Sequence, residues 1–257
     1  MTTQPVAVDC EIPISDAASL PLPHESLWGL DWLALRASAV YRGDGVPRGH
    51  GEPVIVVPGF LGSYSGLHEL TGWLTRMGYA VSDPGFERNI VCPDTLLERL
   101  ESRIAGEHAA RSARVSIIGH SLGGSLARAA AVRAPEHVEQ VITLGSPLRE
   151  MRAQTLVAEL ARLLAALAPS PHRPHPGHEH GLTCSCELAE ALAQPFPSSV
   201  RRTAVYSRRD GVVDWRTSME GDPSIDVEVA GTHVGLVVNA SVYEAIARAL
   251  ASGEVAA

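Results

Sequence analysis

Apolar runs alternate with amphipathic segments along most of the chain, and this alternation predicts strands and helices in turn. The continuous apolar runs are typical of strands buried on both faces of a parallel sheet. Predicted strands cover residues 52–59, 79–81, 114–118, 138–147, 200–206 and 225–230, and predicted helices cover 27–41, 65–77, 94–104, 122–134 and 242–250. The order predicts an α/β fold with a mostly parallel sheet, right-handed crossovers and helices on both faces.

The alternation breaks over residues 148–199, where we expect an insert. It begins with an amphipathic helix at 153–167, continues as a loop of alternating His and Pro, and ends with a second short helix. Residues 1–26 are rich in Pro, Ser and Asp without a clear period, which predicts a loosely attached arm. We therefore expect residues 1–257 to form one domain that carries an arm and an insert.

The most informative stretch is Gly119-His-Ser-Leu-Gly123, which fits the G-x-S-x-G pattern of a nucleophile elbow. An apolar strand precedes it and an alanine-rich helix follows, as an elbow requires. The tight strand-to-helix turn leaves no room for side chains at the two glycines. Such a turn exposes the Oγ of Ser121 above the sheet, beside the free N–H groups of a helix start.

An elbow serine needs a base to take its proton and an acid to orient that base. Asp210 and His233 follow the last two predicted strands, in the order expected for this architecture. Asp214 competes with Asp210, although its position before Trp215 is typical of a helix N-cap. His120 adjoins the nucleophile but should point away from it. The other histidines lie before the catalytic strands, on predicted helices or in the insert.

Acyl transfer also needs two N–H donors for the oxyanion. The backbone N–H of Leu122 directly follows the nucleophile. Phe60 can supply the second amide, because Gly59 permits a close approach after the first inner strand.

Together these motifs resemble the lipase/esterase branch of the α/β-hydrolases. The resemblance covers about residues 50–250 and rests on motifs at Val57-Pro-Gly-Phe-Leu-Gly62, Gly119-His-Ser-Leu-Gly-Gly124, Leu144-Gly-Ser-Pro147, Tyr206-Ser-Arg-Arg-Asp210 and Gly231-Thr-His-Val-Gly-Leu236. It implies the α/β-hydrolase fold, with Ser121, Asp210 and His233 as nucleophile, acid and base. It also implies an oxyanion hole at Phe60 and Leu122 and a lid at 148–199, although an ordinary packed helix fits the insert as well. Pro58 departs from the histidine that the family usually carries there.

Charge and composition limit the classes of partner that we expect for this protein. A net charge of −8 without a basic cluster argues against nucleic acid. No leader-like start and no apolar run of membrane-spanning length is seen, so we expect a cytoplasmic protein that can contact a lipid surface transiently. The four cysteines predict no disulfide framework.

Six potential metal ligands gather in the insert: His172, His175, His178, His180, Cys184 and Cys186. Two interpretations of this cluster are open: a zinc site, or a His- and Pro-rich loop without metal. We favour the loop because the spacing of the ligands matches no standard zinc site. Acyl transfer by a Ser-His-Asp set needs neither metal nor cofactor, and we expect none.

The sequence thus predicts a serine hydrolase that cleaves carboxylic esters through an acyl-enzyme. A thioesterase or an acyltransferase with the same triad is the alternative, because one elbow serves them all. A catalytically silent protein that uses the fold for binding is the third hypothesis. Acyl length, the alcohol part and the oligomeric state stay open.

Overall fold

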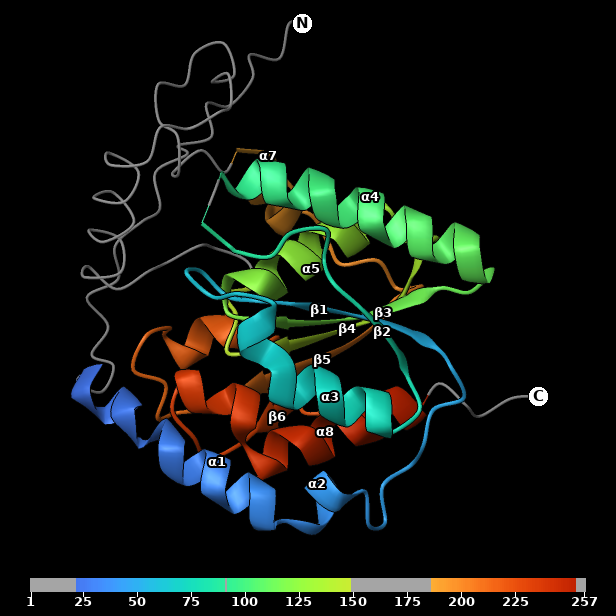
Figure 1. Ribbon diagram of the computed structural model, residues 1–257. Coiled ribbons are helices and arrows are strands. Elements are labelled where there is room, and N and C mark those ends of the chain that lie inside the picture. The colour runs from blue at the N-terminus through green and yellow to red at the C-terminus, as the bar shows by residue number, and fades with distance from the viewer. Residues whose placement is uncertain (1–21, 91, 149–185, 253–257) are drawn as a thin grey trace, which may run out of the picture.

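Six parallel strands form a single sheet in the order β2-β1-β3-β4-β5-β6 (Figure 1). The computed structural model describes residues 22–90, 92–148 and 186–252. The strands are β1 (Pro53–Val57), β2 (Ala80–Ser82), β3 (Val115–His120), β4 (Val138–Leu144), β5 (Arg201–Tyr206) and β6 (Asp226–Glu228). The predicted α/β fold with a parallel sheet is confirmed.

Helices cover both faces of this sheet (Figure 1). One face carries α4 (Pro93–Arg111), α5 (Leu122–Arg133) and α7 (Cys186–Ala193), and the other carries α1 (Trp28–Ala37), α2 (Ala39–Arg42), α3 (His68–Arg76) and α8 (Ala240–Ala251). The described residues also form four short 3-10 helices: η1 (Leu22–Leu27), η2 (Ser65–Leu67), η3 (Trp215–Ser218) and η4 (Val234–Val238).

The side chains of each strand alternate between two apolar cores, which explains the continuous apolar runs. In β1, Val54 and Val56 face the core that holds Trp73 of α3. Ile55 and Val57 face the opposite core, beneath α4 and α5. All five residues of β1 are therefore buried.

Parallel strands bring their carboxyl ends to one edge of the sheet, where ligands of open α/β sheets usually bind. Ser121 directly follows β3, Asp210 follows β5, and His233 follows β6. The topology therefore gathers three residues that are far apart in sequence at one edge.

The structure describes the expected N-terminal arm, residues 1–26, only from residue 22 onward. Residues 22–27 form η1, and Glu25 within it is buried. The predicted helix at 27–41 is two helices, because Ser38 ends α1 and caps α2 by accepting a hydrogen bond from the N–H of Tyr41. Residues 1–21 lie outside the described residues.

The second short helix of the expected insert at 148–199 is α7. Leu188 and Leu192 of α7 are buried in the core beneath α4 and α5. Asp94, in the first turn of α4, accepts hydrogen bonds from the N–H groups of Glu187 (3.3 Å) and Leu188 (3.0 Å). α7 is thus part of the domain core, and residues 149–185 lie outside the described residues.

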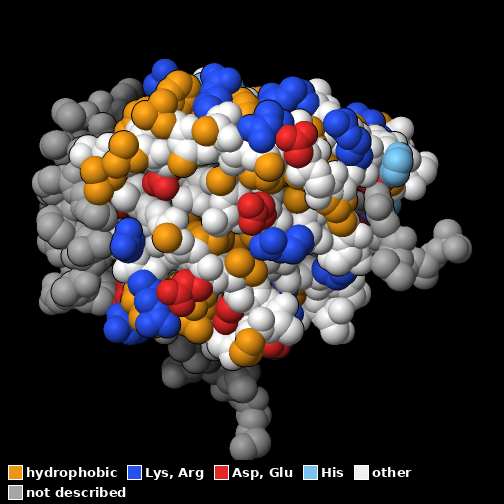
Figure 2. Space-filling view, turned by 90° about the horizontal axis from the view of Figure 1, so that it is seen from below, with side chains coloured by type: hydrophobic (Ala, Val, Ile, Leu, Met, Phe, Trp, Pro, Cys, Tyr) orange, Lys and Arg blue, Asp and Glu red, His pale blue; other side chains and the backbone are white. Residues whose placement is uncertain are grey.

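The face of the molecule that Figure 2 shows is mixed in charge. Figure 2 shows Arg and acidic side chains interspersed with apolar ones on this face. Within the described ranges, no helix is long and apolar enough to cross a membrane.

Candidate active site

Ser121 stands in a strained turn between β3 and α5. Its φ of 53° and ψ of −127° lie in a region that non-glycine residues rarely adopt, and such strain is typical of functional sites. A side chain at Gly119 would overlap the backbone of Gly123 and Gly124, so the strand can turn into the helix only with glycine there. The predicted elbow geometry is therefore present.

Asp210 and His233 meet in a buried hydrogen bond between the loops that follow β5 and β6. His233 Nδ1 lies 2.7 Å from Asp210 Oδ2, and both residues are nearly inaccessible. The other carboxylate oxygen of Asp210 accepts hydrogen bonds from the N–H groups of Val212 (2.8 Å) and Val213 (2.7 Å). These two bonds orient the carboxylate toward Nδ1 of the imidazole, and within the described residues Nε2 makes no hydrogen bond.

Asp214, the competing acid, has a different role. It is the N-cap of η3, and its Oδ1 accepts a hydrogen bond from the N–H of Arg216 at 3.1 Å. The capping role expected from its position before Trp215 is confirmed.

The end of β4 lies between the serine and the histidine. The N–H of Ser121 donates to the carbonyl of Leu144 at 2.9 Å. A Cβ built on the next residue, Gly145, would lie 2.9 Å from Asp210 Oδ2 and 3.3 Å from His233 Nδ1. Ser121 and the Asp210–His233 pair therefore both adjoin the end of β4. Only a glycine at position 145 lets the pair approach this strand end so closely.

The pKa of His233 lies above its ordinary value. Burial lowers this pKa, but the charge and hydrogen bond of Asp210, together with the charge of Glu25, raise it by more. The surroundings of His233 thus stabilise the positively charged imidazolium. A histidine that acts as a general base acquires this positive charge when it takes up a proton.

His120 lies against His233, a contact that the sequence did not indicate. The two rings are 4.7 Å apart between centroids, and His120 Nε2 lies 3.0 Å from the carbonyl oxygen of His233. Burial and the neighbouring His233 lower the pKa of His120 to about 3, so the ring is neutral and its Nε2–H donates to that carbonyl. His120 supports the histidine loop rather than titrating itself.

Two backbone amides flank the serine. Leu122 is the first residue of α5, where a helix leaves N–H groups without internal partners and carries the positive end of its dipole. A Cβ built on Gly59 would lie 2.9 Å from Ser121 Cβ, so the backbone directly before Phe60 comes close to the serine. In the part of the chain that the structure describes, neither the Leu122 nor the Phe60 N–H donates a hydrogen bond.

Asn89 anchors the loop that contains Phe60. In this loop Pro58 occupies the position where the resemblance to lipases implies a histidine. Asn89 Nδ2 donates to the carbonyl of Pro58 at 2.8 Å, and the Asn89 backbone exchanges hydrogen bonds with Leu61 and Gly62 at 2.9 and 3.0 Å. Asn89 is fully buried. It comes from a loop before α4, and no sequence pattern pointed to it.

The sequence model of the alpha/beta hydrolase fold family matches residues 52–221, which is well over half of the chain. The chain belongs to the α/β-hydrolase family. The match contains Ser121 and Asp210 and ends before His233.

Solved structures share the fold of this α/β-hydrolase at low sequence identity. Lipase BlEst2 from Bacillus licheniformis matches in its propeptide form with a TM-score of 0.56 and 15% identity, over 79% of this chain and 51% of that one. Its mature form matches at 0.54 and 14%, over 79% and 93%. A monoacylglycerol lipase from Paleococcus ferrophilus matches at 0.52 and 16%, over 79% and 95%. The chain thus spans about half of the propeptide form. No curated protein matches it in sequence.

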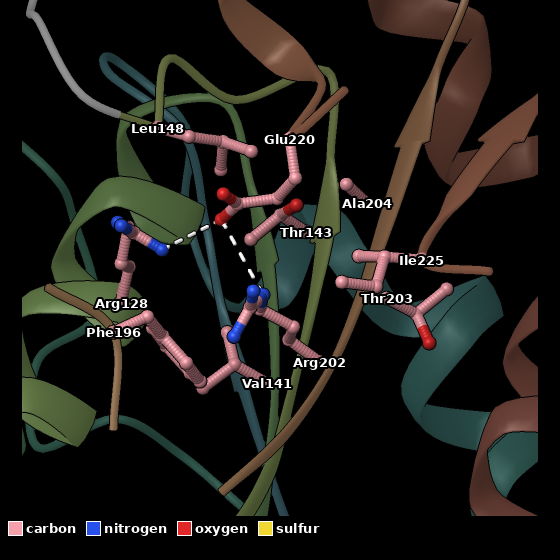
Figure 3. Close-up of a pocket in the computed structure, with 10 residues that line it drawn as sticks. All are labelled: Arg128, Val141, Thr143, Leu148, Phe196, Arg202, Thr203, Ala204, Glu220 and Ile225. Carbon is pink, nitrogen blue, oxygen red and sulfur yellow. Dashed lines mark hydrogen bonds and ion pairs between the residues drawn. The ribbon is translucent and has the colours of Figure 1, made fainter. Parts of the chain in front are cut away.

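A separate small cavity of this α/β-hydrolase lies between α5, β4 and β5 (Figure 3). Its volume is about 10 Å³, which leaves room for about one water molecule. Glu220 stands at its edge and pairs with Arg128 at 2.7 Å and with Arg202 at 3.7 Å (Figure 3). The cavity is too small for a substrate, and its charges pair with one another.

The predicted ligand cluster at 172–186 cannot be compared with the structure. Residues 149–185 lie outside the described residues, and nothing is described of the Cys186 side chain. Among the residues that are described, no group of three or more His, Cys, Asp or Glu is arranged to hold a metal ion.

Proposed function

We propose that this α/β-hydrolase is a serine hydrolase that cleaves carboxylic esters through an acyl-enzyme. The observation that carries the proposal is the buried Asp210–His233 hydrogen bond at the same sheet edge as Ser121, which stands in a strained elbow. Similarity to lipases in fold is consistent with this activity. The chemistry of the site suits an acyl substrate, and the fold similarity to lipases favours an ester over a thioester.

In the proposed mechanism, Asp210 fixes the histidine tautomer with the proton on Nδ1, which leaves Nε2 as the base. Nε2 takes the proton of Ser121 Oγ as the oxygen attacks the ester carbonyl. The Phe60 and Leu122 N–H groups stabilise the negative charge that forms on the carbonyl oxygen. The alcohol leaves with the proton from His233, and a water activated in the same way then releases the acid.

Ser121→Ala tests this proposal directly. Wild-type protein should react with a fluorophosphonate probe at Ser121 and hydrolyse p-nitrophenyl esters from acetate to palmitate. The variant should fold, show no labelling and lose turnover by roughly 10⁴-fold or more, since the nucleophile is gone. A parallel series of acyl thioesters decides between an esterase and a thioesterase. Labelling at another residue, or wild-type activity in the variant, would refute the assignment of the nucleophile.

A further inference from the structure

Glu25 of η1 binds the two loops that carry the proposed acid and base. Its Oε1 accepts hydrogen bonds from the N–H of Gly211 (2.8 Å), which follows Asp210, and from the N–H of His233 (3.1 Å). Its Oε2 accepts from the N–H of Val234 at 2.8 Å. One side chain from the start of the described chain therefore joins the loops after β5 and β6.

These three donors suit a carboxylate. Glu25 is only 8% exposed, and burying a carboxylate is costly unless hydrogen bonds satisfy it. Three backbone donors supply that compensation, and hydrogen bonds to a charged acceptor are stronger than neutral ones. A glutamine would meet the donors with only one acceptor atom, because its NH₂ group cannot accept from an N–H.

The peptide groups of His233 are held from both sides. Glu25 accepts from the His233 N–H, and His120 donates to the His233 carbonyl oxygen. A second anchor comes from α1, where Asp31 accepts a hydrogen bond at 2.9 Å from the side chain of Asn239, the cap of α8. The histidine loop thus rests on the N-terminal segment as well as on the sheet.

We propose that Glu25 is a positioning residue for the proposed hydrolase: it holds the Asp210 and His233 loops in register and places a negative charge beside the imidazole. This inference rests on the proposed function for its effect on turnover. In the described part of the chain, the titratable groups that face His233 are Asp210 from the β5 loop, Glu25 from η1 and the neutral His120 from β3. Of these, Asp210 and Glu25 raise the pKa of His233 against the lowering effect of burial.

The experiment compares Glu25→Gln and Glu25→Ala with Glu136→Gln as a matched control. Glu136 is exposed and precedes β4, at the sheet edge opposite the site, so its variant should behave as wild type. We would measure kcat and KM against pH on a short p-nitrophenyl ester, the pKa of His233 by NMR titration of its ring nitrogens, and unfolding by urea.

Glu25→Gln should fold and lower kcat by roughly 10-fold with little change in KM, and Glu25→Ala should lower it by roughly 100-fold, because small misplacements of catalytic groups cost this much. The acid limb of the pH profile and the NMR pKa of His233 should both move to lower pH in the two variants, since a neighbouring negative charge has been removed.

Two results would overturn the proposal. In one, the folded variants keep the wild-type kcat and the wild-type His233 titration. In the other, the variants lose stability alone, with His233 titrating as before, which would make Glu25 a purely structural residue. The NMR titration does not depend on hydrolysis. An inactive wild type would therefore refute the proposed function while the titration still decides the role of Glu25. If Glu25→Ala does not fold, Glu25→Gln decides.

Discussion

Asp210 and Asp214 stand on one loop, yet their carboxylates have different partners. Asp210 orients His233, whereas Asp214 caps η3. In Asp210→Asn the new NH₂ group would donate to Nδ1, so the proton would sit on Nε2 and the base would be blocked. We expect kcat to fall by up to about 10⁴-fold, as in serine proteases.

Asp214→Asn is the matched control for that variant, because Asn and Asp cap helices about equally well. It should keep most of the activity and nearly the wild-type Tm. Steady-state kinetics and thermal unfolding of both variants check the assignment. If Asp214→Asn were the inactive one, the acid would have been misassigned.

The fall of kcat/KM at low pH should reflect the ionisation of His233 alone. The base must be neutral to accept a proton, so kcat/KM should fall as the pH drops through the pKa of His233, which is raised above its ordinary value. His120, with a pKa of about 3, cannot produce this limb. A pH–rate profile with a stability check at each pH measures it. A limb below the ordinary histidine range would argue against His233 as the base.

At the scale of elements, Asp94 ties α4 to α7. Its carboxylate accepts hydrogen bonds from two N–H groups in the first turn of α7, where a negative charge also suits the helix dipole. Asp94→Ala should lower the free energy of unfolding by about 1–2 kcal/mol, as loss of a helix cap does. Glu98→Ala on the exposed side of α4 is the control and should change it by at most about 0.5 kcal/mol. Equal losses in urea unfolding would contradict the capping role.

At the scale of the whole molecule, α7 packs in the domain core, so we test the predicted lid by replacing only the residues before α7. Replacing residues 149–184 by a Gly-Ser linker should keep the fold and activity on acetate esters, because no proposed catalytic residue lies there. It should change the preference for acyl chain length. Removing 148–199 instead should unfold the protein, since buried Leu188 and Leu192 of α7 go with it. Circular dichroism and the ester series distinguish these outcomes; loss of acetate hydrolysis in the folded linker variant would contradict the lid hypothesis.

The sequence by itself determined the parallel sheet and the elbow. Both are local patterns: apolar runs mark buried strands, and the glycines at 119 and 123 mark a turn that tolerates no side chain. Chain order and strand ends then placed Asp210 and His233 as partners, and the position of Asp214 before Trp215 predicted its capping role.

Only the tertiary structure decided which groups support the site. Glu25 accepts from a residue 186 positions later in the chain, and Asn89 holds a loop about 30 residues before it. His120 contacts His233 because the ends of β3 and β6 reach the same edge of the sheet. No local period encodes such contacts, since a buried polar side chain finds its donors through the fold and not through its neighbours in sequence.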